Sequence, residues 1–128
     1  MRRLVLQIQA GEFSICRLLP SEPVPAWAGS AGFHAIVRTA DELSLLCAAP
    51  LVPPGVRAER GWRMLKFAGP FAFTATGILA SVLAPLARKK IGILALSTFD
   101  TDYLLVKADK LDAAIRAIES AGHTVRRT

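Results

Sequence analysis

Apolar residues follow two different periods in the second half of the chain. Over 62–67, 91–96 and 103–107 they alternate with polar residues or form short unbroken runs, which is typical of strands in a buried or half-buried sheet. Over 74–90 and 110–121 an apolar residue recurs every three or four positions, which predicts two amphipathic helices. A short strand is expected at 123–126. The resulting order of strand, helix, strand, strand, helix, strand is the split βαβ, or ferredoxin-like, pattern.

Polar residues and glycine mark the expected ends of the second helix. Asp109 is placed to cap its amino end, and Gly122 is expected to stop it in a left-handed conformation. Asp112 and Arg116 have the i, i+4 spacing of an ion pair on one helix face.

The first half of the chain repeats the same order in a shortened form. Strands are expected over 4–9, 13–19, 33–38 and 43–47. Three prolines over 20–25 leave room for only one helical turn, at 26–28. The second helix is replaced by the proline-rich segment 50–61, which we interpret as the junction between the halves. Segment 4–9 is expected to supply the missing edge strand of the first half.

A constant spacing supports a duplication. Four pairs of residues at an offset of 59 are identical within one turn and the strand that follows it: Thr39 and Thr98, Asp41 and Asp100, Leu45 and Leu104, Leu46 and Leu105. We therefore predict an α+β protein of two ferredoxin-like units packed side by side, the first degenerate with a shortened helix. The expected domains are 1–58 and 59–128.

Composition and cysteine usage favour a globular protein of the cytoplasm. The chain is 52% hydrophobic and 20% charged, which suits a packed core and excludes disorder. No apolar run approaches the roughly 20 residues that span a bilayer, and the amino end lacks the features of a signal peptide. Cys16 and Cys47 are expected to be buried free thiols. His34 and His123 are isolated, and structural roles are expected for both.

The net charge of +6 invites a nucleic-acid interpretation. The basic residues are spread in small groups at the ends of elements, which is typical of a solvated surface. The strands at 91–96 and 104–106 are aliphatic, so they lack the aromatic platform of RNA-recognition motifs. We expect neither nucleic-acid nor membrane binding.

Several motifs of the second half resemble those of the ACT domain. They are Gly61-Trp62-Arg63, Gly69-Pro70-Phe71, the segment from Thr76 to Leu86 and the segment from Ser97 to Tyr103. The chain as a whole resembles small bacterial proteins with tandem ACT domains. It is more distantly similar to the regulatory half of aspartate kinases and to the cytosolic arginine sensors of the mTOR pathway.

The resemblance implies a non-catalytic regulatory module. ACT domains usually bind amino acids and switch an enzyme, so it implies an amino-acid ligand, a homodimer and a possible partner enzyme. No enzyme is attached to this chain and the first unit is degenerate, which are departures from the family pattern. No cofactor or metal is expected.

An amino acid is a zwitterion, so its site needs donors for a carboxylate and acceptors for an ammonium group. The turn that begins at Phe73 and opens the first helix offers amides and a positive dipole end. The turn between the strands offers hydroxyls and carboxylates. The candidate ligand-binding residues are Thr74, Thr76, Gly77, Ile78, Ser97, Thr98, Asp100, Thr101 and Asp102. Because these two turns need not meet within one unit, we expect a site at an interface between units.

Structural roles compete with each of these assignments. Thr74 and Thr76 are also candidates for helix caps, and Asp100 and Asp102 for turn formers. Thr39 and Asp41 are the weaker equivalents in the first unit. Two other functions stay open. One is a ligand-free interaction or dimerisation module that uses strand edges or segment 50–60. The other is an enzyme with Asp100 and Asp102 as metal ligands, which is disfavoured because no third ligand lies nearby in sequence.

Overall fold

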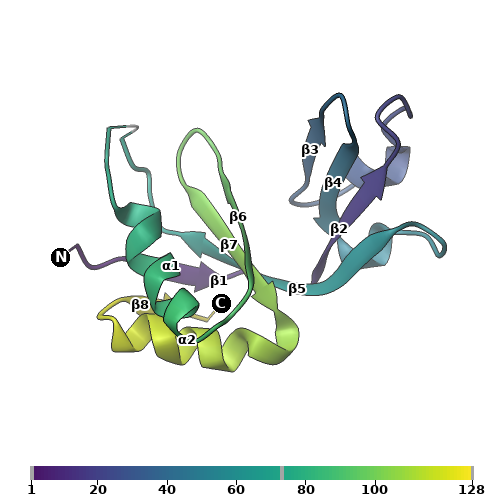
Figure 1. Ribbon diagram of the computed structural model, residues 1–128. Helices are drawn as coiled ribbons and strands as arrows, with labels where there is room; N and C mark the ends of the chain where they lie inside the picture. Colours follow the sequence, from purple (N-terminus) through teal and green to yellow (C-terminus); the bar gives the residue numbers. More distant parts are fainter. Residues whose placement is uncertain (1, 73, 128) are drawn as a thin grey trace. The chain divides into compact units, whose positions relative to one another are not determined.

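The computed structural model describes residues 2–72 and 74–127, which form eight strands, two α-helices and three short 3-10 turns (Figure 1). The chain divides into two compact units. Unit 1 consists of Met1–Ala10 and Arg63–Thr128, and unit 2 consists of Gly11–Trp62. Unit 2 is therefore inserted into the sequence of unit 1. The linear division into 1–58 and 59–128 stays a prediction about the repeat and does not describe the packing.

The sheet of unit 1 has the strand order β6-β7-β5-β1-β8. Its strands are β1 (Val5–Ile8), β5 (Ala58–Phe67), β6 (Ile93–Ser97), β7 (Asp102–Lys107) and β8 (Thr124–Arg126). β1 is antiparallel to β5 and parallel to β8, so it lies between them. The prediction that segment 4–9 belongs to the first half is wrong. Leu4, Leu6 and Ile8 are buried in the core of unit 1, and this burial fixes the pairing of β1.

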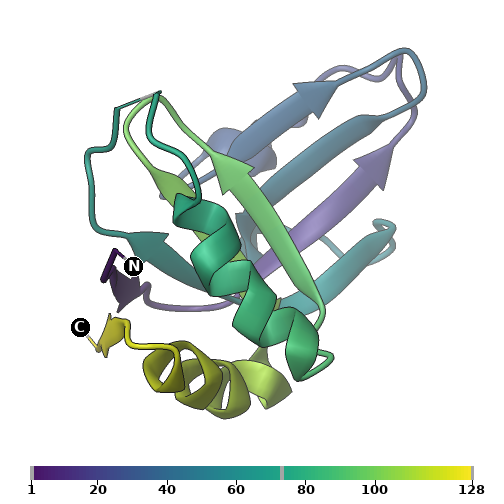
Figure 2. The same cartoon turned by 60° about the vertical axis from the view of Figure 1, so that its left-hand side comes forward.

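Both α-helices cover one face of the unit 1 sheet (Figure 2). They are α1 (Ile78–Arg88) and α2 (Leu111–Ser120). The predicted apolar stripes face inward: Val82 and Leu86 of α1 and Ile118 of α2 are buried against Phe67 and neighbouring strand residues. Neither helix in the described part of the chain is long and apolar enough to cross a membrane.

Both helices begin later than predicted. Gly77, with φ of 75°, is the amino-terminal cap of α1, and no side chain hydrogen-bonds there, so neither Thr74 nor Thr76 is a cap. Phe73 lies outside the described residues. The 3-10 turn η3 (Ala108–Lys110) precedes α2 and contains Asp109, which does not cap α2 either. A backbone turn thus replaces the side-chain cap at each helix start.

The carboxyl end of α2 agrees with prediction, whereas one expected ion pair is missing. Gly122 has a positive φ of 99° and follows the last residues of α2. Asp112 and Arg116 share the spacing of a pair, but no ion pair joins them in the described structure. Their side chains therefore stay available to solvent or to a ligand.

Unit 2 has the strand order β3-β4-β2-β5, which is the ferredoxin-like order without α-helices. Its own strands are β2 (Phe13–Leu18), β3 (Ala35–Arg38) and β4 (Leu43–Ala48), and the start of β5 completes the sheet. The 3-10 turns η1 (Ala26–Gly29) and η2 (Ala49–Leu51) take the places in the strand order that α1 and α2 have in unit 1. The prediction of a degenerate first unit is confirmed. The end of the predicted junction, from Ala58 onward, is strand.

The core of unit 2 contains both cysteines. Cys16, Leu43, Leu45 and Cys47 are each at most 1% exposed. The cysteines are free, as predicted. Burial raises the pKa of both thiols above its ordinary value, because the thiolate is poorly solvated there.

The predicted repeat is visible as two hairpins with the same register. Arg38 pairs with Leu43 across the β3–β4 turn, and Ser97 pairs with Asp102 across the β6–β7 turn, at the same offset of 59. In each turn the threonine amide donates to the carbonyl oxygen three residues later, at 2.9 Å for Thr39 and 2.8 Å for Thr98. The conserved offset therefore marks a duplicated hairpin.

Candidate functional site

A cleft of about 330 Å³ opens in unit 1 between the start of α1 and the β6–β7 turn. Figures 1 and 2 both show the loop before α1 beside the tip of that hairpin. Thr74 and Thr76 are exposed and do not line the cleft. The other predicted site residues do line it: Gly77, Ile78, Ser97, Thr98, Asp100, Thr101 and Asp102. The structure thus brings together most of the residues that the sequence singled out.

Direct contacts hold the two walls of the cleft together. The Phe71 amide donates a hydrogen bond to the Asp100 carbonyl oxygen at 2.9 Å. The buried Thr101 hydroxyl donates to the Phe67 carbonyl oxygen at 2.7 Å. The two segments are therefore neighbours within one unit. The two turns thus meet without help from a second unit, because Phe67 at the end of β5 bonds the β6–β7 turn, and a site at an interface between units stays a prediction.

The first wall is the amino end of α1. The first helical hydrogen bond runs from the Ser81 amide to the Gly77 carbonyl oxygen. The preceding amides, from Ile78 to Ala80, have no partner within the helix. No side chain caps this end and no acidic residue lies in the first turn. Ile78, Leu79 and Ala80 line the cleft, so amide donors and the positive end of the helix dipole are close to it.

The second wall is the acidic turn. Ser97 donates its hydroxyl proton to a carboxylate oxygen of Asp102, so part of the acceptor capacity of Asp102 is used within the turn. The carboxylate of Asp100 is exposed and makes no hydrogen bond or ion pair with the described residues. Thr98 bonds the backbone of Thr101 and shapes the turn. Asp100 is thus the acceptor with the greatest capacity for a ligand.

This arrangement has donors on one side and acceptors on the other. A carboxylate is stabilised at the start of a helix, and an ammonium group is stabilised by Asp100. The β3–β4 turn of unit 2 carries the matching Thr39 and Asp41. Among the described residues of unit 2, however, the corresponding place before β3 holds only the 3-10 turn η1 and no α-helix. Within the described ranges, a helix start that provides amide donors beside the acidic turn is therefore found only in unit 1.

Sequence reasoning missed the apolar part of the lining. Phe71, Ala72, Ala75, Leu79, Ala80 and Phe99 also line the cleft. Phe71, Leu79, Ala80 and Phe99 lie inside the motifs that carry the family resemblance, which was the available signal. Ala72 and Ala75 lie outside these motifs and gave no signal, because a small side chain marks a site only by the space that it leaves.

Gly69→Ala is expected to destabilise the protein by about 1–2 kcal/mol. A Cβ at Gly69 would lie 3.1 Å from the Asp100 carbonyl oxygen and from Thr101, so the turn would have to shift. Gly92→Ala is the matched control, because a Cβ there meets nothing within 4 Å. Urea denaturation measures both changes. Equal urea midpoints for the two variants would show that the β6–β7 turn is not packed tightly against Gly69.

The described residues contain no group of three or more His, Cys, Asp or Glu side chains that would suit a metal ion. Asp100 and Asp102 therefore have no third ligand of these types among residues 2–72 and 74–127.

A family model for the ACT domain matches residues 57–120. A second model, described as an N-terminal domain, matches residues 11–54. The chain is 36% identical to the bovine protein named cytosolic arginine sensor for mTORC1 subunit 1 over 66 residues, and to its human counterpart over 59 residues. These matches include 48% and 45% of this chain but only 20% and 18% of the sensors, so the chain spans about one fifth of their length.

Solved structures extend the similarity to both units. A protein of Agrobacterium tumefaciens is 44% identical, with a TM-score of 0.95 over 100% of this chain and 96% of its own. The regulatory subunit of aspartate kinase from Thermus thermophilus has a TM-score of 0.64 at 12% identity, over 91% of this chain and 97% of its own. The second similarity shows the fold alone. With the ACT model covering 57–120, the chain belongs to the ACT domain family.

Proposed function

We propose that the protein is a non-catalytic regulatory module that binds a free amino acid in the cleft between α1 and the β6–β7 turn. One observation carries the proposal: unpartnered helix amides and the carboxylate of Asp100 line the same cleft. These are the two halves of a zwitterion site. A volume of about 330 Å³ lies at the lower end of the range for small-molecule sites.

Membership of the ACT family supports a regulatory role, because its domains serve as ligand-binding regulators. The name of the arginine sensors supports an amino acid as the ligand class. A partner enzyme that responds to the bound state belongs to the same proposal. Which amino acid binds would depend on the contacts that its side chain makes with the apolar lining and with the acidic turn.

Asp100→Asn is expected to weaken amino-acid binding about tenfold, because an amide forms a weaker hydrogen bond to an ammonium group than a carboxylate does. Thermal shift against the twenty amino acids identifies the ligand, and isothermal titration calorimetry then measures the affinity. At 100 times Kd the ligand should add about 2.7 kcal/mol to the free energy of unfolding. Asp41→Asn is the matched control at the equivalent turn of unit 2, and its affinity should stay within about twofold of wild type.

A second variant tests the other wall. Ala80→Glu places an acidic side chain in the first turn of α1, where the dipole favours it. The helix should therefore be as stable as before, while the new carboxylate repels the carboxylate of the ligand. Loss of binding without loss of stability is the expected result. Binding that survives both Asp100→Asn and Ala80→Glu would rule out this cleft as the site.

One observation favours a second function, a dimerisation module. β3 is an edge strand of unit 2, and its Ile36 and Val37 are 43% and 56% exposed. Exposed apolar edge strands pair with other strands. If this edge joins two copies, Val37→Lys should convert a dimer to a monomer in sedimentation velocity, and Asp100→Asn should not.

A further inference from the structure

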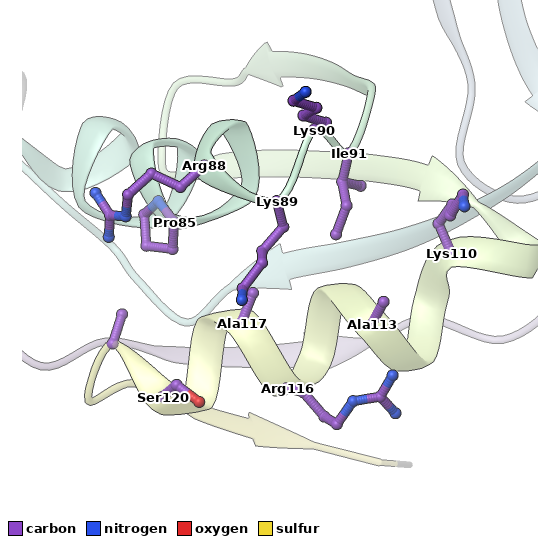
Figure 3. A pocket seen from close by; sticks show the side chains of 11 residues that line it. Pro85, Arg88, Lys89, Lys90, Ile91, Lys110, Ala113, Arg116, Ala117 and Ser120 are labelled. Carbon is purple, nitrogen blue, oxygen red and sulfur yellow. The ribbon is translucent and has the colours of Figure 1, made fainter.

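A second cavity of unit 1 lies at the opposite end of α1, between the end of that helix and α2 (Figure 3). Its volume is about 540 Å³. Since α1 has 11 residues, the two cavities are separated by on the order of 16 Å along the helix axis. We call this second cavity the basic groove. It does not share any lining residue with the amino-acid cleft.

Among the described residues, five cationic side chains line the basic groove, and no acidic side chain does. They are Arg88, Lys89, Lys90, Lys110 and Arg116. None of the five forms an ion pair or side-chain hydrogen bond with residues in the described ranges. Figure 3 shows Lys89 extending toward Ala117 of α2, with the other four cationic side chains spread around the groove. So many cations around one cavity without a counter-charge attract anions.

Local helix electrostatics accounts for only part of this cluster. Arg88, Lys89 and Lys90 lie at the carboxyl end of α1, where the helix dipole favours cations. Lys110 lies at the amino-terminal cap of α2, where the dipole disfavours a cation. Arg116 is in the middle of α2 and forms no ion pair with Asp112, its expected partner. Two of the five cations thus lack a structural reason for their position.

Lys90 occupies a conformation that glycine normally provides. Its φ is 57°, and no other described non-glycine residue has a positive φ. The Ile91 amide donates to the Leu86 carbonyl oxygen at 3.0 Å and the Lys90 amide donates to that of Ala87 at 3.0 Å, which is the Schellman motif. Glycine is the preferred residue at this position because it has no Cβ. A strained residue of this kind is a starting point for a functional hypothesis.

The shape of the groove limits the kind of anion. Its uncharged lining consists mostly of small or short apolar groups, including Pro85, Ile91, Ala113 and Ala117. No aromatic side chain of the described part of the chain lines it, so these residues offer no platform for stacking the bases of a nucleic acid. Lys110 and Arg116 are about 9 Å apart along α2. That span suits several linked anionic groups better than a single phosphate or carboxylate.

We propose that the basic groove binds a compact ligand with a chain of phosphoryl groups. A nucleoside triphosphate and inorganic triphosphate share this chemistry. Arg88 and Arg116 would form bidentate bonds with phosphoryl oxygens, and the lysines would act as point charges. The groove gives the module a second input, which is separate from the amino-acid cleft and does not depend on it.

Isothermal titration calorimetry of the full chain with ATP and with inorganic triphosphate, at about 0.15 M salt, tests the proposal. Lys89→Gln combined with Arg116→Gln should weaken binding at least about tenfold. Arg126→Gln combined with Arg127→Gln is the matched control: it removes the same charge from exposed positions outside the groove, and its affinity should stay within about twofold. Tighter binding of ATP than of triphosphate would identify a nucleotide, and equal binding an inorganic chain.

Three outcomes would overturn the proposal. The first is that the wild-type protein binds neither ATP nor triphosphate. The second is that the groove variant and the control variant lose affinity equally. The third is that a ten-residue polyglutamate peptide or a short single-stranded RNA binds more tightly than triphosphate. Lys90→Gly gives an independent readout. Replacing a strained lysine by glycine should raise Tm while the affinity for triphosphate falls, whereas a purely structural Lys90 would change Tm alone.

Discussion

Leu104→Ala will lower the free energy of unfolding by about 3 kcal/mol. Leu104 is fully buried in the core of unit 1, on the face of the sheet that the two helices cover. Removing three carbon atoms there costs the transfer free energy of these atoms and leaves a cavity among side chains that are held by a sheet and two helices. The loss should be visible as a lower urea midpoint of the helical circular dichroism signal.

The repeat offers a matched control for this experiment. Leu45 is the equivalent residue of unit 2 and is also fully buried. Trp27 and Trp62 both belong to unit 2, whereas α1 and α2 belong to unit 1. Leu45→Ala should therefore lower the urea midpoint of tryptophan fluorescence more than that of the helical signal. Leu104→Ala should do the reverse. A loss below about 1 kcal/mol for Leu104→Ala would contradict the packing described here.

His123→Ala should cost about 2–3 kcal/mol, the second largest effect that we expect. His123 is only 4% exposed, and its ring links Leu4, the residue before β1, to Ser81 of α1. Its Nδ1 accepts a hydrogen bond from the Leu4 amide at 3.1 Å, so the proton of the neutral ring is on Nε2. Nε2 donates this proton to the Ser81 carbonyl oxygen at 3.2 Å. Alanine would leave the buried Leu4 amide without its acceptor and open space beside α1.

His34→Ala is the control for this prediction. His34 is exposed, and among the described residues its ring bonds only the nearby Gly32 carbonyl oxygen, so its removal should change stability by less than about 0.5 kcal/mol. Chemical denaturation at neutral pH compares the two variants. If they unfold at the same midpoint, His123 is not the link between β1 and α1.

Much of the fold could be predicted because its signals are local. Strand alternation, the helical stripes of α1 and α2, and the glycine stop after α2 each depend on residues within a few positions of one another. The offset of 59 located the duplicated hairpin, because a turn is specified by its own threonine and by the strand that follows it. The acidic wall of the cleft was found in the same way.

The rest depended on contacts between distant segments. The alternation of Leu4, Leu6 and Ile8 shows that one face of β1 is buried, but it does not show which core receives it. The amino-terminal cap of α1 is Gly77, because its backbone has a positive φ. The sequence favoured Thr74 and Thr76 instead, because threonine is a common capping residue. The basic groove could not be predicted, because its cations come from residues 88–90, 110 and 116 and meet only when α1 and α2 pack together.

Because unit 2 is inserted into the sequence of unit 1, it can be removed from the chain without separating the parts of unit 1. The chain leaves unit 1 after β1 and returns at β5, and the Gln9 amide bonds the Met64 carbonyl oxygen at 2.8 Å across that gap. A tight turn in place of residues 11–62 would join β1 and β5 as an ordinary antiparallel hairpin. Both cavities with proposed ligands lie in the part that would remain, so a protein of about three fifths of the length would be enough to study them.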